Sequence, residues 1–265
     1  MRLPLNINNT SAKKSLGQNF ITDNNFLLSM DRYIESSKNN ILIEIGPGKG
    51  ALTKYLSQKH FKRLYLIEKD DFLAERLEEN YKNYKNIKVI KGDALTYNYN
   101  KFRDKKYNVI IYGNLPFNIS TKLVSLWLGD IKWPSFFDKM ILMFQKEVGD
   151  RITASHNSKK YGRLSVLVQS RCRVKKLMNA PASIFQPKPK VDGAIIQFEP
   201  INDYKSINYQ KLGTLLEKSF NGRRKKIKNT LKDYKYFLQK LQIDDNLRPE
   251  NLSVSDYCNL VRLIK

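Results

Sequence analysis

The chain has 265 residues, of which 41% are apolar, so it can bury one large hydrophobic core and a smaller one and is not a disordered chain. Its formal net charge of +23 indicates a polyanionic partner, although an AT-rich genome that favours lysine codons would also raise the charge. No apolar run approaches the roughly 20 residues that span a bilayer, which excludes a transmembrane protein and favours nucleic acid as the partner.

The cysteines and histidines are too few and too scattered for a metal site or a disulfide framework. Cys172 and Cys258 stand far apart, and the only histidines are His60 and His156. We interpret both cysteines as small buried hydrophobic residues and expect no metal. Residues 1–10 contain no continuous apolar stretch of the kind found in signal peptides, so we expect a reducing, cytoplasmic setting.

Short apolar runs alternate with amphipathic stretches from Ile41 onward, a pattern typical of an α/β protein with a parallel sheet. We expect helices at about residues 24–35, from about 51, and at 71–81. We expect strands at residues 41–45, 63–67, 87–90, 107–112, 140–144, 164–170 and 194–198.

The pattern changes after Pro200. Strand-like runs end, and apolar residues recur at helical spacing at Leu212, Leu215, Leu216, Phe220, Ile227 and Leu231. We therefore expect two domains, a cofactor-binding α/β domain over residues 1–200 and a small helical domain over residues 201–265.

A glycine-rich turn, residues 44–50 (EIGPGKG), ends the first expected strand and predicts a cofactor site. Glycines there let the backbone turn sharply and approach a ligand closely, so we expect Gly46 and Gly48 to line it. Such turns also occur in dinucleotide sites, so the motif alone is ambiguous. Pro47 and the G-x-G-x-G spacing fit a cofactor without phosphates better than the G-x-G-x-x-G of nicotinamide enzymes.

Two carboxylates follow the next strands and narrow the kind of cofactor. Glu68 ends the second strand, where it can accept both hydrogen bonds of a ribose diol. Asp93 follows the third strand, with Ala94 beside it, and can accept a hydrogen bond from an adenine amine. Together with the glycine turn, these residues predict a pocket for an adenosine.

The fourth strand runs into residues 113–117 (GNLPF), which we interpret as the reacting centre, because ligands in such folds lie beyond the carboxyl ends of the strands. An adenine N6 amine is a poor nucleophile, since its lone pair is delocalised. The Asn114 side-chain oxygen and the Leu115 carbonyl can accept its two N–H groups and release that lone pair for methylation. Pro116 stiffens the turn, and Phe117 offers a face for an extruded base, a stacking contribution of about 1–3 kcal/mol.

These motifs resemble those of the KsgA (RsmA) family of rRNA adenine N6-dimethyltransferases, relatives of the Erm resistance methyltransferases, over nearly the whole chain. Residues 14–21 (KSLGQNFI) look like the N-terminal LGQNFL motif of that family. The match implies that Asn19 and Ile21 touch the cofactor. Ile21 replaces the usual leucine, which is neutral if the contact is through the main chain.

The resemblance implies S-adenosylmethionine as the cofactor, with its methionine part on Gly46, its ribose on Glu68 and its adenine on Asp93. It also implies that Asn114 is the catalytic asparagine. Phe117 stands where bacterial members commonly have tyrosine, which keeps the stacking face and loses a hydroxyl group.

Three later segments resemble the KsgA type: residues 144–148 (FQKEV), 161–167 (YGRLSVL) and 185–192 (FQPKPKVD), the last of which Erm proteins share. The resemblance implies a Rossmann-like class I methyltransferase domain with a small C-terminal helical domain. It implies dimethylation of two adjacent adenosines near the 3′ end of small-subunit (16S) rRNA in late small-subunit assembly. The small ribosomal subunit and its rRNA are the expected partners, and we expect a monomer without membrane association.

The densest basic run, residues 223–228 (RRKKIK), lies between Phe220 and Leu231, which can anchor it while its cations face outward. No acidic residue interrupts the five cations, and phosphate neutralisation by such a run gives affinity with little sequence information. We expect RNA contacts from Arg223, Arg224, Lys225 and Lys226.

Three alternatives remain open. An Erm-like enzyme would methylate an adenine of large-subunit rRNA instead. A non-catalytic nucleic-acid binder would keep the fold, although the intact residues 114–117 argue against lost chemistry. A nicotinamide oxidoreductase is a more distant third.

Overall fold

The computed structural model describes residues 12–13, 17–103, 106–129, 133 and 135–264, apart from the side chain of Asn118. Residues 1–10 and residues 14–16 of the expected N-terminal motif therefore lie outside the described residues. The chain forms two compact units, which we call the first unit (Met1–Leu126, Phe136–Lys146, Lys176–Gln197) and the second unit (Trp127–Ser135, Glu147–Lys175, Phe198–Lys265). The two-domain boundary expected at residue 200 stays a prediction.

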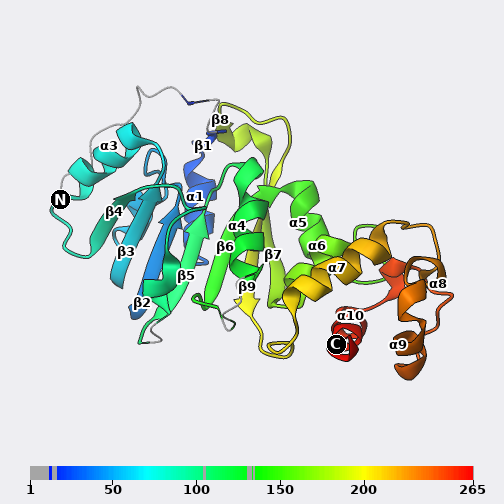
Figure 1. Ribbon diagram of the computed structural model, residues 1–265. Coiled ribbons are helices and arrows are strands. Elements are labelled where there is room, and N and C mark those ends of the chain that lie inside the picture. Colours follow the sequence, from blue (N-terminus) through cyan, green and yellow to red (C-terminus); the bar gives the residue numbers. More distant parts are fainter. Residues whose placement is uncertain (1–11, 14–16, 104–105, 130–132, 134, 265) are drawn as a thin grey trace. The chain divides into compact units, whose positions relative to one another are not determined.

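A central sheet organises the first unit (Figure 1). Five strands pair in parallel, in the order β4 (Ile87–Lys91), β3 (Phe61–Glu68), β2 (Ser37–Ile45), β5 (Asn108–Gly113) and β6 (Lys139–Gln145). The sheet continues after β6 with β9 (Gly193–Pro200) and β7 (Cys172–Ala180). The strand order reverses between β2 and β5, and ligands of open α/β sheets bind at such a switch point. The expected α/β fold with a parallel sheet is confirmed.

Helix α3 (Asp71–Tyr81) shows why the expected helices form. Asp70 caps its N-terminus by accepting hydrogen bonds from the amides of Phe72 and Leu73, an arrangement that typically contributes about 1 kcal/mol. The helix buries an apolar stripe at helical spacing, formed by Leu73, Ala74, Leu77 and Tyr81. The other helices that begin in the first unit are α1 (Asn24–Asp31), α2 (Thr53–Leu56), α4 (Phe117–Gly129) and α5 (Lys146–Ile152).

A second sheet has only two short strands. β1 (Phe20–Ile21) and β8 (Phe185–Gln186) pair in antiparallel register, with Phe20 opposite Gln186. Figure 1 shows them side by side. The amide and the hydroxyl of Thr22 both donate to the Ile184 carbonyl, at 2.8 and 3.1 Å, and extend the link. A segment near the start of the described chain is thus tied to one near residue 185.

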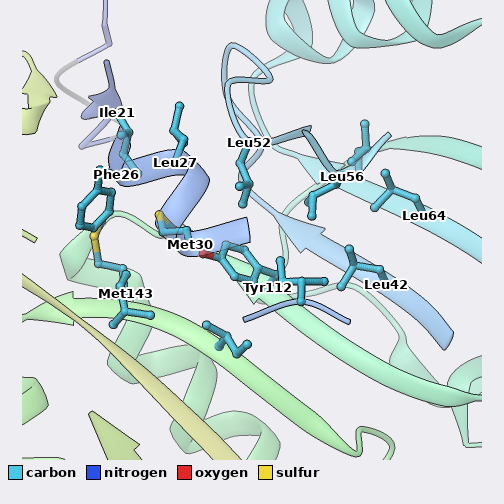
Figure 2. Packing of buried hydrophobic residues seen from close by; sticks show 14 of the residues in the cluster. Ile21, Phe26, Leu27, Met30, Leu42, Leu52, Leu56, Leu64, Tyr112 and Met143 are labelled. Atoms are coloured by element: carbon cyan, nitrogen blue, oxygen red, sulfur yellow. The ribbon is translucent and has the colours of Figure 1, made fainter. Parts of the chain in front are cut away.

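One core cluster of the first unit combines side chains of the central sheet with side chains of α1, α2 and α3. Figure 2 shows Met30 of α1 facing Tyr112 of β5, with Leu42, Leu56 and Leu64 beside them. These side chains are at most 1% exposed. Burial of such a side chain contributes about 1.5–3 kcal/mol, so the core holds the carboxyl ends of the strands in fixed positions.

The second unit is helical in its C-terminal part, as expected. It contains α6 (Arg163–Gln169), α7 (Tyr209–Phe220), α8 (Ile227–Thr230), α9 (Lys235–Lys240) and α10 (Val254–Leu263), with short 3₁₀ turns at Lys232–Tyr234 and Pro249–Asn251. Inside its core, Ser219 and Tyr257 share a 2.8 Å hydrogen bond between their hydroxyl groups. Cys172 and Cys258 are buried and free, which confirms their interpretation as buried small residues.

Two expected elements were wrong or incomplete. A strand was expected at residues 164–170, but this stretch lies almost wholly in helix α6, and the strand lies further on, as β7. The run has β-branched residues, but the Ser165 hydroxyl accepts from the Gly162 amide and caps a helical turn, while Val166 and Val168 are buried. The helix expected from residue 51 is α2, which has four residues and begins at Thr53.

Within the described residues, no helix combines the length and apolarity needed to cross a membrane.

Candidate active site

The expected cofactor-binding and catalytic residues come together in one cavity of about 1170 Å³ in the first unit. Except for Asn19 and Ile21 of the N-terminal segment, they lie at the carboxyl ends of β2, β3, β4 and β5, which the parallel pairing brings to one edge of the sheet. The residues are Asn19, Ile21, Gly46, Gly48, Glu68, Asp93, Ala94, Asn114, Leu115, Pro116 and Phe117.

The glycine turn after β2 needs its glycines for two reasons. Gly46 and Gly48 have φ angles of +63° and +58°, a backbone region that residues with a Cβ rarely adopt. A Cβ on Gly48 would also lie 3.0 Å from the Phe20 ring, so the close approach of β1 requires a glycine there. The turn thus exposes its backbone to the cavity, and the absence of a side chain at Gly48 lets Phe20 of β1 pack against it.

Glu68, at the end of β3, is 5% exposed and receives one main-chain amide on each carboxylate oxygen. The amides of Gly48 and Asp70 donate to it, both at 2.9 Å. Burial raises the pKa of Glu68, while these amides favour its ionised form. A carboxylate has about four acceptor positions, so main-chain amides leave Glu68 able to accept further hydrogen bonds from a diol in the cavity. The geometry fits the ribose role expected for this residue.

Asp93 lies after β4 and forms an ion pair with Lys69, with Oδ2 and Nζ 2.9 Å apart. The hydrogen bond from Lys69 lowers the pKa of Asp93, and the Leu95 amide adds to this with a 2.9 Å bond to Oδ1. Asp93 is therefore an ionised acceptor at the cavity wall, which suits a hydrogen bond from an adenine amine. Lys69 also lines the cavity and was not among the expected residues.

Asn114 is held by a partner from the N-terminal segment. Its side-chain amide donates to the Asn19 main-chain carbonyl at 3.4 Å, which directs the side-chain oxygen elsewhere as an acceptor. The Leu115 side chain is 1% exposed and anchors the loop. The Pro116 carbonyl accepts from the amides of Ile119 and Ser120 at 3.0 and 3.3 Å, in the first turn of α4. Two polar acceptors of the loop, from Asn114 and Leu115, are thus candidates for a bound amine.

Phe117 is the first residue of α4 and lines the cavity with part of its surface. It also packs against the core cluster of the first unit. The aromatic face is thus backed by the core beside the Asn114 loop, which fits a stacking surface for a planar base.

Glu44 is a cavity residue that belongs to the glycine motif and for which the sequence predicted no role. It is 3% exposed and accepts a 2.7 Å hydrogen bond from the Thr53 hydroxyl. Burial raises the pKa of Glu44 to about 8, and the nearby Glu68 contributes to the rise. A carboxylate within a buried strand was the signal available in the sequence.

Part of the cavity wall comes from residues 185–192. The sequence analysis used this segment for the family resemblance and predicted no place for it in the site. Phe185, Gln186, Pro187 and Pro189 line the cavity, held there by the pairing of β8 with β1. Local sequence patterns do not predict such a pairing, because the two strands have two residues each.

The basic run of the second unit divides into two kinds of residue. Arg223 donates to the main-chain carbonyls of Lys159 and Tyr161, the latter at 2.8 Å, so it connects two segments of this unit. Arg223 is itself exposed, as expected, and these two bonds add a structural role that the sequence did not predict. Arg224, Lys225 and Lys226 are exposed, and Lys226 Nζ donates to Asn246 Oδ1 at 3.3 Å.

The anchors of this run behave as expected, since Leu231 is buried and Phe220 packs against the core of the unit. Among the described residues there is no group of three or more His, Cys, Asp or Glu side chains placed to hold a metal ion.

Comparisons with known proteins agree with this geometry. The model of the family described as ribosomal RNA adenine dimethylase matches residues 9–265. The ribosomal RNA small subunit methyltransferase A of Pelagibacter ubique is 40% identical over 256 residues, which cover 95% of this chain and 96% of that protein. A dimethyladenosine transferase structure from Plasmodium falciparum is 26% identical, with a TM-score of 0.77 and coverage of 91% and 95%.

The structure of the 23S rRNA methyltransferase ErmE is 20% identical, with a TM-score of 0.69 and coverage of 92% and 98%, and shows the shared fold alone. The fold is that of a Rossmann-like class I methyltransferase. Since the family model spans nearly all of the sequence, and the relative from Pelagibacter ubique is similar along its full length, this chain belongs to the ribosomal RNA adenine dimethylase family.

Proposed function

We propose that this enzyme transfers methyl groups from S-adenosylmethionine to the N6 amines of two adjacent adenosines near the 3′ end of small-subunit rRNA. The observation that carries this proposal is the single cavity that joins the glycine turn, Glu68 and Asp93 to residues 114–117. The names of the similar proteins from Pelagibacter ubique and Legionella pneumophila, both small subunit methyltransferase A, favour the small subunit over the large one.

The cavity suits S-adenosylmethionine in its hydrogen-bond acceptors and in the open backbone of its glycine turn. Glu68 can accept further hydrogen bonds from the ribose diol, and Asp93 is an ionised acceptor for the adenine amine. Gly46 and Gly48 keep the backbone open where the methionine part would lie, and Asn19 and Ile21 border the same space. When bound, the cofactor supplies a methyl group made electrophilic by its positively charged sulfur.

The residues at 114–117 would prepare the adenine amine to accept that methyl group. The Asn114 side-chain oxygen and the Leu115 carbonyl each accept one N6 hydrogen, which favours a tetrahedral nitrogen with its lone pair directed at the methyl carbon. Hydrogen bonding of Asn114 to the Asn19 carbonyl fixes the orientation of this side chain before substrate arrives. The proton leaves after transfer, when the nitrogen is cationic and acidic.

Phe117 would hold the extruded base by stacking, with a contribution of about 1–3 kcal/mol. Its backing by the core cluster keeps the ring in place at little entropic cost. Extrusion lets the base reach a cavity that a stacked nucleotide cannot enter. Residues 114–117 would therefore orient the adenine, accept its amine hydrogens and support its ring, so that no strong base is needed.

RNA affinity would come from basic residues, principally Arg224, Lys225 and Lys226 of the second unit, with Arg223 positioning the loop. We assign residues 201–265 to a helical RNA-contacting domain and residues 1–200 to the methyltransferase domain. A monomer that acts on the assembling small subunit in the cytoplasm completes the proposal.

The decisive experiment supplies labelled S-adenosylmethionine with small subunits that lack this modification and maps the methylated bases. We expect N6,N6-dimethyladenosine at two adjacent positions with the wild-type enzyme and with Asn39→Ala. Asn39 is an exposed residue near the start of β2, far along the strand from the cavity. Asn114→Ala should give almost no product.

Large subunits are the second substrate in this experiment. Methylation of large subunits in preference to small ones would replace the proposal with an Erm-like function. Equal activity of Asn114→Ala and Asn39→Ala would remove residues 114–117 from the reaction. Binding of small subunits without any product from the wild-type enzyme would identify a non-catalytic relative.

A further inference from the structure

The segment at residues 17–21, which we call the strap, lies along the cavity, and all five of its residues line it. Its C-terminal end is held by the pairing of β1 with β8, through Phe20 opposite Gln186. Phe20 also covers Gly48 of the glycine turn. The strap therefore forms one wall of the proposed cofactor site, and the position of its other end decides the shape of that site.

The N-terminal end of the strap is held by Asp70. The Asp70 carboxylate accepts a 3.3 Å hydrogen bond from the Gln18 side chain and forms a 2.9 Å ion pair with Lys13 through the same oxygen, Oδ2. The Lys13 amide donates in turn to the Gln18 side-chain oxygen at 2.8 Å. These three residues form a closed ring of contacts, which we call the clasp.

The clasp is joined directly to the ribose carboxylate. The Asp70 amide donates to Glu68 Oε1 at 2.9 Å, while the other carboxylate oxygen of Asp70, Oδ1, caps helix α3. The Asp70 side chain is 2% exposed, so it is held firmly between the helix and the strap. Asp70 thus fixes the position of the strap relative to Glu68.

The charge state of Asp70 suits this position. Burial alone would raise its pKa, but hydrogen bonds from Lys13, the Leu73 amide and Gln18 outweigh burial and lower it. The carboxylate is therefore ionised at neutral pH and makes charge-assisted hydrogen bonds, which are stronger than neutral ones. Lys13 is half exposed, so its share of the interaction is reduced by solvent.

We propose that Asp70 is a positioning residue for cofactor binding, which acts through Lys13 and Gln18 to hold the strap over the cavity. This inference rests on the proposed function, because it assumes that S-adenosylmethionine occupies the cavity. A docked strap presents Asn19 and Ile21 to the cofactor in advance, so binding does not have to order them. Loss of the clasp should weaken cofactor binding more than it slows the chemical step.

The test compares Asp70→Asn, Lys13→Met and the double variant with a matched control, Asp71→Asn. Asparagine at position 70 still caps α3, so the fold is retained while the charge is lost. Asp71 is an exposed carboxylate one residue further on, and its replacement changes the net charge equally. Calorimetry measures the Kd for S-adenosylmethionine alone, without RNA, and hydrogen exchange of residues 17–22 measures docking of the strap.

We expect each single variant to raise the Kd by about fivefold to tenfold, a loss of the size of one ordinary hydrogen bond, because solvent weakens the interaction of the half-exposed Lys13 with Asp70. The double variant should resemble the single variants, because both substitutions break the same interaction. Exchange in residues 17–22 should accelerate without cofactor, while Tm and kcat at saturating cofactor stay unchanged. Asp71→Asn should match the wild-type enzyme.

Two results would overturn the inference while the proposed function survives: equal effects of Asp70→Asn and Asp71→Asn, or effects of Asp70→Asn and Lys13→Met that multiply in the double variant. Faster exchange throughout the protein with a lower Tm would also overturn it, since Asp70 would then serve the fold alone. A wild-type enzyme that does not bind S-adenosylmethionine would instead remove the proposed function and this inference together.

Discussion

The Asn114 side-chain amide donates to the main-chain carbonyl of Asn19, across 95 positions of the sequence. The Asn19 side chain makes a separate bond, donating to the Gly17 carbonyl at 3.1 Å. The side chain of Asn19 therefore supports the strap, while its backbone supports the proposed catalytic residue. Substitutions at these two positions should have different kinetic effects.

We predict that Asn114→Ala lowers kcat by about 100-fold or more, since an acceptor aimed at the reacting nitrogen is lost. Asn19→Ala keeps the carbonyl that orients Asn114 and releases only the Gly17 contact. It should chiefly raise the KM for S-adenosylmethionine. Steady-state kinetics on small subunits separate the two effects, and a larger kcat loss for Asn19→Ala would contradict this division.

For Phe117, we predict that Phe117→Leu lowers kcat/KM for small subunits by roughly tenfold to 100-fold, because a flat stacking face is lost. Phe117→Tyr keeps the aromatic face and should remain within about threefold of the wild-type value. Because the ring also packs on the core cluster, thermal melting of both variants is the control. Equal activities of the leucine and tyrosine variants would show that the ring does not stack on the base.

The buried Glu44 makes stability depend on pH. Its pKa is about 8 in the folded chain and near 4.5 in the unfolded chain, so between these values the folded state binds more protons. The contribution of Glu44 to the free energy of unfolding should therefore be fully present below pH 4.5 and be lost as the pH rises from 4.5 through about 8. Glu44→Gln can still accept from Thr53 and does not ionise.

Denaturation followed from pH 5 to 9 checks this. The decline should be smaller in Glu44→Gln than in the wild-type protein, because the variant lacks the carboxyl that loses its proton. Parallel curves for the two proteins would assign the decline to other groups.

The two kinds of residue in the basic run should respond differently to substitution. Arg224→Met and Lys225→Met should weaken small-subunit binding and reduce the slope of log K against log salt by about 0.7–0.9 per lost phosphate contact. Neither should change Tm, because both side chains are exposed. Cofactor affinity should also be unchanged.

Arg223→Met should instead lower the free energy of unfolding by about 1 kcal/mol, because the Lys159 and Tyr161 carbonyls lose their donor. Urea denaturation measures this loss of stability. Small-subunit binding at several salt concentrations measures the change in salt dependence expected for Arg224→Met and Lys225→Met. A full salt effect without loss of stability in Arg223→Met would restore this residue to the RNA surface.

Much of the fold follows from local patterns. The strands of the first unit read as apolar runs bounded by turn residues, and α3 has both its cap at Asp70 and its apolar stripe in the sequence. The ends of these strands are therefore enough to locate Gly46, Glu68, Asp93 and Asn114. A parallel sheet has its ligand edge defined by topology, so the order of the motifs along the chain predicts that they meet.

Other features depend on contacts between distant residues. Residues 164–170 have the composition of a strand, and only their burial and the Gly162 to Ser165 hydrogen bond favour a helix. The β1 and β8 strands are too short to carry any periodic signal. The role of Arg223 was missed because its partners are carbonyls, which any residue type can provide. In each case the structure is decided by contacts between residues that are not neighbours in the local sequence pattern.

The pairing of β1 with β8 has a consequence for how the enzyme matures during its synthesis. Thr22 and Ile184, which extend this pairing, are 162 positions apart, so a nascent chain cannot complete the cavity wall until Gln186 has left the exit tunnel. The five parallel strands end at Gln145 and can assemble earlier. The order of synthesis thus separates the parallel strands, which are made first, from a finished binding site, which needs a segment made 40 residues later.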